Sequence, residues 1–124
     1  MKPIITALTL SGALLAAAAA AEPPAMTAGD LAQLCSGADH VSRNACRIYI
    51  LGVTQGISLG MRIADGKAGA ARPCVPAGVS ADAVEQTVKD KLAGIGSAAE
   101  RGREASGFIG AILISAFRCS KAGH

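Results

Sequence analysis

The sequence predicts an all-α protein, a compact bundle of about four helices held together by two disulfide bonds. Three observations lead to this prediction. Apolar residues recur at helical spacing in several segments, and no segment has the strict alternation of a strand. Capping residues precede these segments and glycines follow them. Four cysteines follow a secretory leader, and an even number of cysteines in an exported chain predicts disulfides.

Residues 1–21 have the pattern of a cleaved secretory signal peptide. Lys2 supplies a positive charge, the run from Ile4 to Ala20 is apolar, and small residues at Ala19–Ala21 offer a cleavage site. A membrane span needs about 20 apolar residues, so this short alanine-rich run predicts no stable membrane anchor. We expect the mature chain to be one helical domain over residues 22–119, followed by a flexible tail over 120–124.

Charge and composition argue against several classes of partner. The formal net charge is +3 and no basic cluster stands out, which argues against nucleic acid and anionic membranes. The chain has one tyrosine, two phenylalanines and no tryptophan, so its core has to be built from small side chains. Such a core buries little apolar area per residue, and we expect covalent cross-links to compensate.

The first half of the mature chain predicts two helices. The first begins after the capping residue Thr27 and ends at Gly37, which is expected to act as a C′ glycine. The second is capped by Asp39 or Ser42 and runs to about Ala64. It is apolar around most of its circumference, which predicts a buried central helix.

Three glycines recur every four residues on one face of this second helix, at Gly52, Gly56 and Gly60. Each glycine costs a helix about 1 kcal/mol relative to alanine, so the repeat predicts that another backbone packs closely there. A small-residue face on the last predicted helix is the candidate partner. Tyr49 is expected to pack in the core with its hydroxyl at the rim, while a role as a functional contact stays open.

The second half predicts two more helices. Ser80 caps the third, which Gly94 ends. Its buried stripe is expected to consist of Val84, Val88, Leu92 and Ile95. The segment Ser97–Glu100 has the form of a capping box, and the helix that it opens has apolar residues at helical spacing from Ala105 to Phe117.

Helix order ranks the three pairings that four cysteines allow. In an antiparallel hairpin of the first two helices, Cys35 and Cys46 face each other. The fourth helix returns to the end of the bundle where the irregular loop over 65–77 carries Cys74, which brings Cys119 close to it. We therefore predict the bonds Cys35–Cys46 and Cys74–Cys119. The four cysteines are widely spaced and form no C-x-x-C pair, which a zinc, thioredoxin-like or haem-attachment site would need.

The sequence offers no catalytic or metal-binding constellation. Histidine occurs only at His40 and His124, and a nucleophile–base set would need a serine or cysteine held beside one of them. Ser36 and Ser42 lie near His40 in sequence, but capping explains serines in such turns better. Asp39 and His40 alone fall short of a metal site. We therefore expect a protein that is not an enzyme, needs no cofactor and acts by binding another protein.

Four segments, taken together, carry a family resemblance. They are Leu34–Ala38, Cys46–Gly56, Cys74–Ser80 and the closing Ala116–Cys119. Their order and spacing resemble those of the Rap/Tai immunity-protein family of type VI secretion, over roughly the whole mature chain. Two features depart from the family pattern. Arg118 stands where the family usually has proline, and the link Gly94–Arg103 lacks its usual His-Pro segment.

The resemblance implies a small, helical, disulfide-bonded periplasmic protein, often a homodimer, that binds and sterically blocks a peptidoglycan-cleaving amidase delivered by other cells. Two loops are long enough to enter an enzyme's groove, 65–72 and 94–103. The second has the more polar surface, and we expect it to bind the partner. The expected contact residues are Ser97, Glu100, Arg101, Arg103 and Glu104.

Two other functions stay open. Small periplasmic acid-stress chaperones are also short, helical and disulfide-bonded. They require carboxylates whose protonation loosens a dimer, whereas the nine acidic residues here are scattered through a net basic chain. The third possible function is that of a helical binding domain without an enzyme target.

Overall fold

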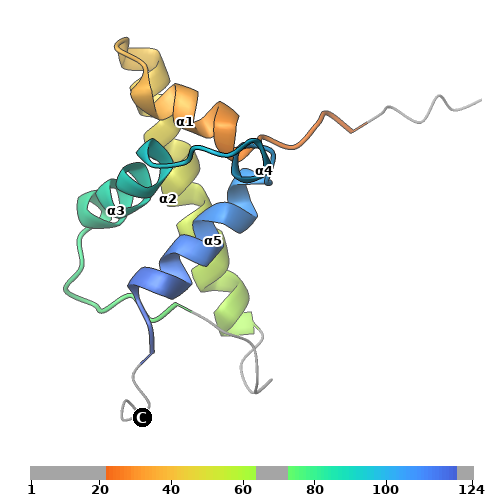
Figure 1. The fold of residues 1–124 in the computed structure, drawn as a ribbon. Helices are drawn as coiled ribbons and strands as arrows, with labels where there is room; N and C mark the ends of the chain where they lie inside the picture. Colours follow the sequence, from red (N-terminus) through yellow and green to blue (C-terminus); the bar gives the residue numbers. More distant parts are fainter. Residues whose placement is uncertain (1–21, 64–72, 120–124) are drawn as a thin grey trace, which may run out of the picture.

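A computed structural model of the protein describes residues 22–63 and 73–119. Over these two stretches the chain forms five helices and no strand (Figure 1). The helices are α1 (Ala28–Ser36), α2 (His40–Ile63), α3 (Ala81–Ala93), α4 (Ala98–Arg101) and α5 (Ala105–Ala116). The all-α prediction is confirmed. The predicted leader, the loop over 65–72 and the tail over 120–124 lie outside the described residues.

Helix α1 begins and ends where the sequence predicts. The Thr27 hydroxyl accepts a hydrogen bond from the Asp30 amide at 3.1 Å, and the Asp30 carboxylate accepts one from the Thr27 amide at 3.1 Å. This reciprocal pair is a capping box. Gly37 ends the helix in an extended conformation, with φ of −60°, rather than the left-handed one of a C′ glycine. Glycine is needed there because a Cβ would lie 2.6 Å from the Cβ of Ser42.

Helix α2 is the longest element and packs against three others. Asp39 caps it, because its Oδ1 accepts a hydrogen bond from the Ser42 amide at 2.8 Å. The helix runs behind α3 and α5 in Figure 1, and α1 crosses its first turns. Cys46 and Ile50 are fully buried on the side that faces these helices. Val53 and Ile57 extend this inner face along the helix and are partly buried against the same core.

The opposite face of α2 is open, which makes the prediction of a buried central helix wrong. Its large apolar side chains are exposed, with Val41 at 78%, Ile48 at 63% and Leu59 at 57%. The predicted close packing on the glycine face is also wrong. A Cβ added at any of the three glycines would meet nothing within 4 Å, and these are Gly52, Gly56 and Gly60. The physical reason is that α1, α3 and α5 all lie on one side of α2, so the other side has no covering element among the described residues.

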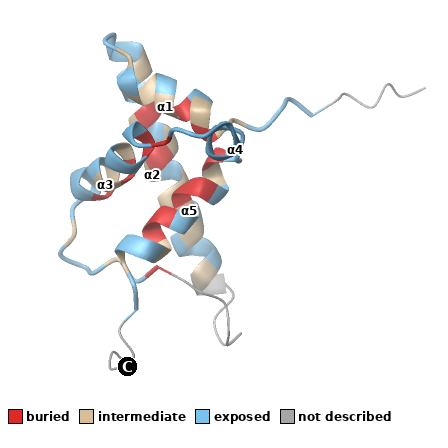
Figure 2. Ribbon diagram, in the orientation of Figure 1, coloured by how far each residue is buried: buried red, intermediate tan, exposed pale blue. Residues whose placement is uncertain are grey.

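The core lies between the inner faces of α1, α2, α3 and α5 (Figure 2). The predicted stripe of the third helix is buried as expected. Helix α5 contributes the larger part of the remaining core through Phe108, Ile109, Ile112 and Leu113. Ser80 caps α3 by accepting a hydrogen bond from the Ala83 amide at 3.2 Å, which agrees with the sequence prediction.

The last predicted helix is interrupted and forms two elements, α4 and α5. Its chain is pinned to the start of α1 at the break. The Ala28 amide donates to the Arg103 carbonyl at 2.8 Å, and the Ala105 amide donates to the Met26 carbonyl at 2.9 Å. Each of these bonds takes a backbone group that a continuous helix would use, so the helix stops and restarts. Helix α4 is therefore a short element held against α1.

Both predicted disulfides are present. The Cα atoms of Cys35 and Cys46 are 5.0 Å apart, and this bond joins the end of α1 to the second turn of α2. The Cα atoms of Cys74 and Cys119 are 4.8 Å apart, and this bond joins the segment before α3 to the residues that follow α5. A backbone hydrogen bond from the Cys74 amide to the Phe117 carbonyl, 2.6 Å long, lies beside the second bond.

Candidate binding surface

The five residues predicted to contact a partner lie on one exposed stretch, residues 94–104, which we call the α4 segment. Two of them are used for capping. The Ser97 hydroxyl accepts from the Glu100 amide at 3.1 Å, and the Glu100 Oε2 accepts from the Ser97 amide at 3.3 Å and from the Ser97 hydroxyl at 3.0 Å. These bonds, and one from the Gly96 amide, hold the pKa of Glu100 below its ordinary value.

The other three predicted contact residues are held by contacts within the α4 segment or with α5. The Arg101 guanidinium donates to the Ile95 carbonyl at 3.4 Å. The Arg103 guanidinium lies over the ring of Phe108, 5.4 Å from its centroid. The Glu104 carboxylate accepts a hydrogen bond from the Ser106 hydroxyl. The α4 segment therefore presents polar groups in a fixed arrangement, on a backbone that is tied to α1.

Tyr49 lies partly buried against the core. Burial raises the pKa of its hydroxyl, and the negative charge of Glu104 raises it further. The ring therefore packs on the core while its hydroxyl lies within the electrostatic reach of the α4 segment.

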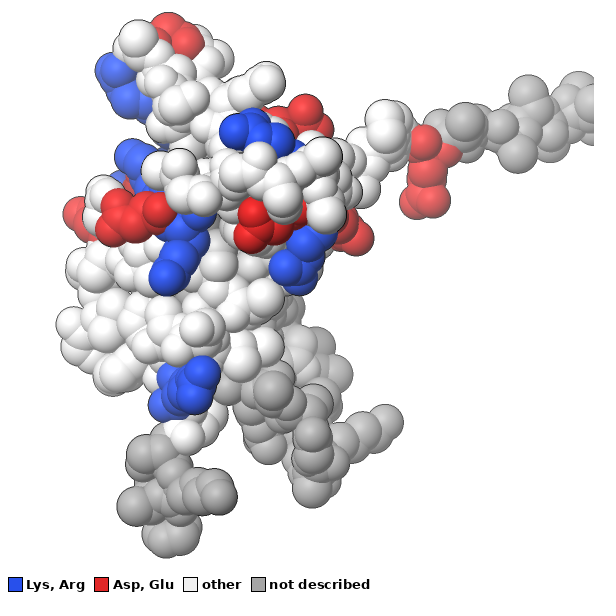
Figure 3. All heavy atoms as spheres, in the orientation of Figure 1, with Lys and Arg blue, Asp and Glu red and all other residues white. Residues whose placement is uncertain are grey.

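Charged side chains of both signs gather over α3 and α4 in Figure 3, and much of the rest of this face is uncharged. A mixed-charge surface of this kind favours a partner with charges of both signs in a matching pattern. It does not have the single sign that nucleic acid or an anionic membrane would require.

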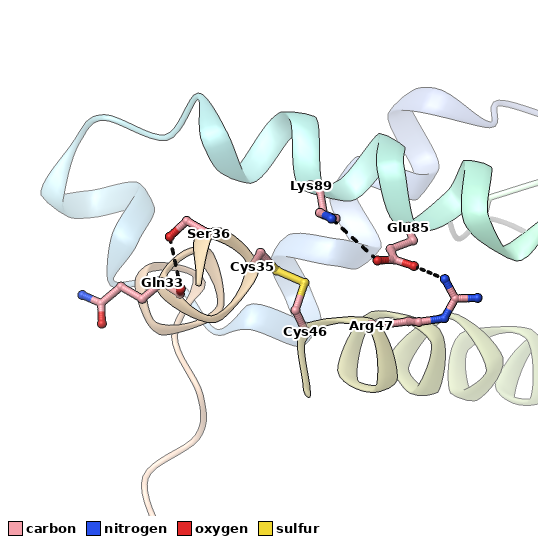
Figure 4. Close-up of a disulfide and its surroundings, with 7 residues drawn as sticks. All are labelled: Gln33, Cys35, Ser36, Cys46, Arg47, Glu85 and Lys89. Carbon is pink, nitrogen blue, oxygen red and sulfur yellow. Dashed lines mark hydrogen bonds and ion pairs between the residues drawn. A yellow bond between two sulfur atoms is a disulfide. The ribbon is translucent and has the colours of Figure 1, made fainter. Parts of the chain in front are cut away.

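A second polar region, not predicted from the sequence, lies between α2 and α3. Arg47 Nη1 bridges to Asp82 at 2.7 Å and to Glu85 at 2.6 Å, and Lys89 lies 3.8 Å from Glu85. Figure 4 shows Arg47 and Lys89 reaching Glu85 from two helices, beside the Cys35–Cys46 bond. The spacing of four residues between Glu85 and Lys89 on the third helix predicts that pair from the sequence, whereas the contribution of Arg47 from α2 has no local signal.

This cluster borders two shallow cavities of about 220 Å³ each, which meet at Lys89. The first is lined by His40, Arg43, Asn44, Arg47, Glu85 and Lys89. His40 therefore shares this cavity with three cationic side chains, one amide and the carboxylate of Glu85. Within residues 22–63 and 73–119, no three histidine, cysteine or acidic side chains gather in a way that suits a metal ion. None of the described helices has both the length and the hydropathy of a membrane span.

Comparison with known proteins gives one match. The sequence matches the family described as Rap1a immunity proteins over residues 27–119, from the cap of α1 to the last cysteine. No curated protein and no solved structure matches. The matched range covers all five helices and both disulfides. Immunity proteins act against secretion-system effectors, so an effector protein is the partner that the match implies. The chain belongs to the Rap1a immunity protein family.

Proposed function

We propose that this protein is a periplasmic inhibitor that binds a peptidoglycan-cleaving amidase, an effector of type VI secretion, and blocks its substrate groove sterically. The immunity role follows from family membership. The type VI system, the amidase and a homodimeric state follow from the resemblance of the four sequence segments. The leader pattern supports export, and two disulfides fit an oxidising compartment.

The observation that supports the binding site most strongly is the combination of a fixed backbone and exposed polar side chains in the α4 segment. Binding costs free energy when loops and side chains lose freedom, at about 0.5–1.5 kcal/mol per immobilised long side chain. Here the capping box and the two backbone bonds to α1 hold the segment before any partner arrives. A segment of fixed shape can enter a groove at low entropic cost.

Arg101 and Arg103 are the proposed anchors of the contact. Arginine is enriched among the residues that dominate binding energy, and its planar guanidinium pairs with carboxylates through two parallel hydrogen bonds. Each of these two guanidiniums already has one neighbour that restricts it, the Ile95 carbonyl and the Phe108 ring. Each side chain remains exposed and free to form further contacts.

A steric inhibitor acts stoichiometrically, because it occupies the groove and transforms nothing. The oxidised mature protein should therefore stop peptidoglycan hydrolysis by its amidase at one chain per active site, without progressive inactivation over time. A panel of purified type VI peptidoglycan amidases is the appropriate set of targets. Failure to inhibit any of them, or inactivation at catalytic amounts of the protein, would overturn the proposal.

The contact surface is tested by charge reversal. The double variant Arg101→Glu/Arg103→Glu should weaken binding to the inhibited amidase by about 1,000-fold, measured by calorimetry, because each anchor contributes about 2 kcal/mol. The matched control is Arg43→Glu/Lys91→Glu, which makes the same charge change on exposed residues outside the α4 segment. The control should bind within about threefold of wild type. Equal weakening in both variants would assign the effect to net charge and not to this surface.

A further inference from the structure

We infer that a groove beside α3 binds an extended acidic peptide segment of a protein other than the amidase. We call it the α3 groove. It consists of the two cavities that meet at Lys89, one between α2 and α3 and the other between α1 and α3. None of its lining residues belongs to the α4 segment. The inference therefore adds a second binding site, and it does not depend on the proposed inhibition of an amidase.

The half of the α3 groove between α2 and α3 is lined mainly by hydrogen-bond donors. Its lining contains three cationic side chains and one carboxylate, together with an imidazole and an amide. The four lining residues from α2 are spaced i, i+3, i+4 and i+7, so they form one stripe along that helix. They are His40, Arg43, Asn44 and Arg47. Lys89 lines the same cavity from α3, and a lining of this kind favours a negatively charged group.

The two arginines of this stripe differ in their acidic partners. Arg47 pairs with Asp82 at 2.7 Å and with Glu85 at 2.6 Å. The exposed Arg43 guanidinium donates to a neutral group, the Ala38 carbonyl. In the described part of the chain no carboxylate lies within 4.0 Å of it. Arg43 therefore keeps N–H groups for the carboxylate of a ligand, which arginine binds through two parallel hydrogen bonds.

A singly charged carboxylate fits this half better than a doubly charged phosphate. The Glu85 carboxylate is part of the lining. Two more carboxylates lie next to the stripe, because Asp39 caps α2 and Asp82 pairs with Arg47. All three repel an anion, and the repulsion grows with the charge of that anion. We therefore expect an aspartate or glutamate side chain in this cavity.

The half of the α3 groove between α1 and α3 suits a peptide backbone. Part of its lining is small or apolar, at Ala32, Leu92 and Ala93. Gln86 and Asp90 supply polar groups. The Gln86 amide donates to Asp90 Oδ1 at 2.7 Å, which leaves oxygen atoms on both side chains that can accept hydrogen bonds from a ligand. Peptide N–H groups are such donors, whereas a single small anion has no group for this half.

The walls of the groove are cross-linked, and its length fits about four residues. The Cys35–Cys46 bond joins α1 to α2, and the ion pair of Arg47 with Glu85 joins α2 to α3 (Figure 4). The walls therefore lose little freedom when a peptide enters. The lining residues of α3 lie between positions 85 and 93, which is about 12 Å of helix. An extended chain covers this distance in about four residues.

The direct test is an NMR titration of the oxidised mature protein with tetrapeptides. The probes are acetyl-Glu-Ala-Ala-Ala-amide and acetyl-Ala-Ala-Ala-Glu-amide, so that both directions of the chain are covered. At least one should shift the amide signals of 40–47 and 86–93 with a Kd of about 1 mM, because exposed ion pairs contribute little affinity. The same peptide with glutamine in place of glutamate should bind at least about fivefold more weakly. Equal binding of the two peptides would overturn the inference.

The preference for glutamate over glutamine also tests the residues of the groove. Arg43→Gln on α2 and Lys89→Gln on α3 should each lower this preference to about twofold or less. Lys91→Gln is the matched control and should keep the full preference, because Lys91 is an exposed cation of α3 that lines neither cavity. Melting temperatures measured for all three variants show whether the fold is intact. An equal loss of preference in the control would assign the effect to net charge and overturn the inference.

Three further outcomes would also overturn it. Acetate or phosphate that binds as tightly as the peptide would make the groove a site for simple anions. A titration to about 10 mM peptide that shifts no signal of either wall would show that no acidic peptide binds there. Loss of amidase inhibition in Arg43→Gln would assign the groove to the effector contact. The titration uses no amidase, so a wrong groove and a wrong proposed function give different results.

Discussion

The two faces of α2 have similar amino-acid content but opposite surroundings. On the inner face, Cys46 and Ile50 are fully buried against three helices. On the outer face, Ile48 is largely exposed and Gly52 has open space around it. The difference teaches that an apolar helix surface indicates burial without indicating which chain buries it. The inner face is covered by other helices of this chain, whereas no element among the described residues covers the outer face.

The largest expected effect is on the inner face. Ile50→Ala should lower the free energy of unfolding by about 2–5 kcal/mol, because it removes buried methyl groups and leaves a cavity. Ile48→Ala should change it by less than about 0.5 kcal/mol in dilute solution, since that side chain is already in water. Urea unfolding of the two variants at a protein concentration of about 1 µM measures both changes. Equal losses would mean that the faces are not distinct in the monomer.

The next largest change in the free energy of unfolding is expected from substitutions at two glycines, one within α2 and one just before it. Gly52→Ala should raise the free energy of unfolding by about 1 kcal/mol, because alanine favours the helix and its Cβ meets no atom. Gly37→Ala should lower it, since the added Cβ would lie 2.6 Å from the Cβ of Ser42. Thermal melts of the two variants should shift in opposite directions. A gain in both would show that the contact at Gly37 relaxes at little cost.

A smaller loss of stability is expected from a substitution on the flank of α2 that faces α3. Arg47→Met removes ion pairs to Asp82 and Glu85 and should lower the free energy of unfolding only slightly, because the Arg47 side chain is 43% exposed and solvent screens the pairs. The loss should shrink as salt is raised from 0.05 to about 1 M. Arg43→Met, whose guanidinium donates to the Ala38 carbonyl, is the control and should show little dependence on salt.

The smallest effect is a pH dependence of the helix caps. Hydrogen bonds from Ser42 lower the pKa of Asp39, and hydrogen bonds from Thr27 lower that of Asp30. A carboxyl whose folded-state pKa lies below its unfolded value stabilises the fold fully above the unfolded value. It loses that contribution as pH falls through the folded one. Melting temperature should therefore be nearly level from pH 7 to 5 and fall below about pH 4.

The matched variant for this pH dependence is Asp39→Asn, which keeps a good capping side chain but cannot titrate. Its melting temperature should fall less steeply with acid than that of the wild-type protein. An identical acid profile in the two proteins would show that Asp39 does not contribute to the dependence.

Local signals in the sequence predicted the features of the fold that depend on neighbouring residues. The capping box at Thr27, the cap at Ser80 and the buried stripe of α3 all depend on residues within a few positions. The break between α4 and α5 could not be predicted in this way. It depends on backbone bonds to Met26 and Ala28, which lie more than 70 residues earlier in the chain.

The candidate site was predictable only as a polar stretch. The sequence pattern identified the capping role of Ser97 and Glu100, because that pairing is local. It did not indicate that Arg101 would reach back to the Ile95 carbonyl. It also did not indicate that Arg103 would lie over Phe108, because that contact depends on how the chain turns at the break. The cluster around Arg47 was missed for a similar reason, since its members come from two helices that meet only in the folded protein.

The two disulfides divide the chain into two closed rings that do not overlap. One ring runs from Cys35 to Cys46 and the other from Cys74 to Cys119. Between Cys46 and Cys74, the main chain is the only covalent connection between the two rings. A protease that cuts once in this interval therefore produces two fragments that no covalent bond connects, whereas a cut inside either ring leaves the molecule in one piece. After a cut in the interval, only non-covalent contacts would keep the fragments together: the packing of α1 and α2 on the later helices, the ion pairs of Arg47 and the backbone bonds from Met26 and Ala28.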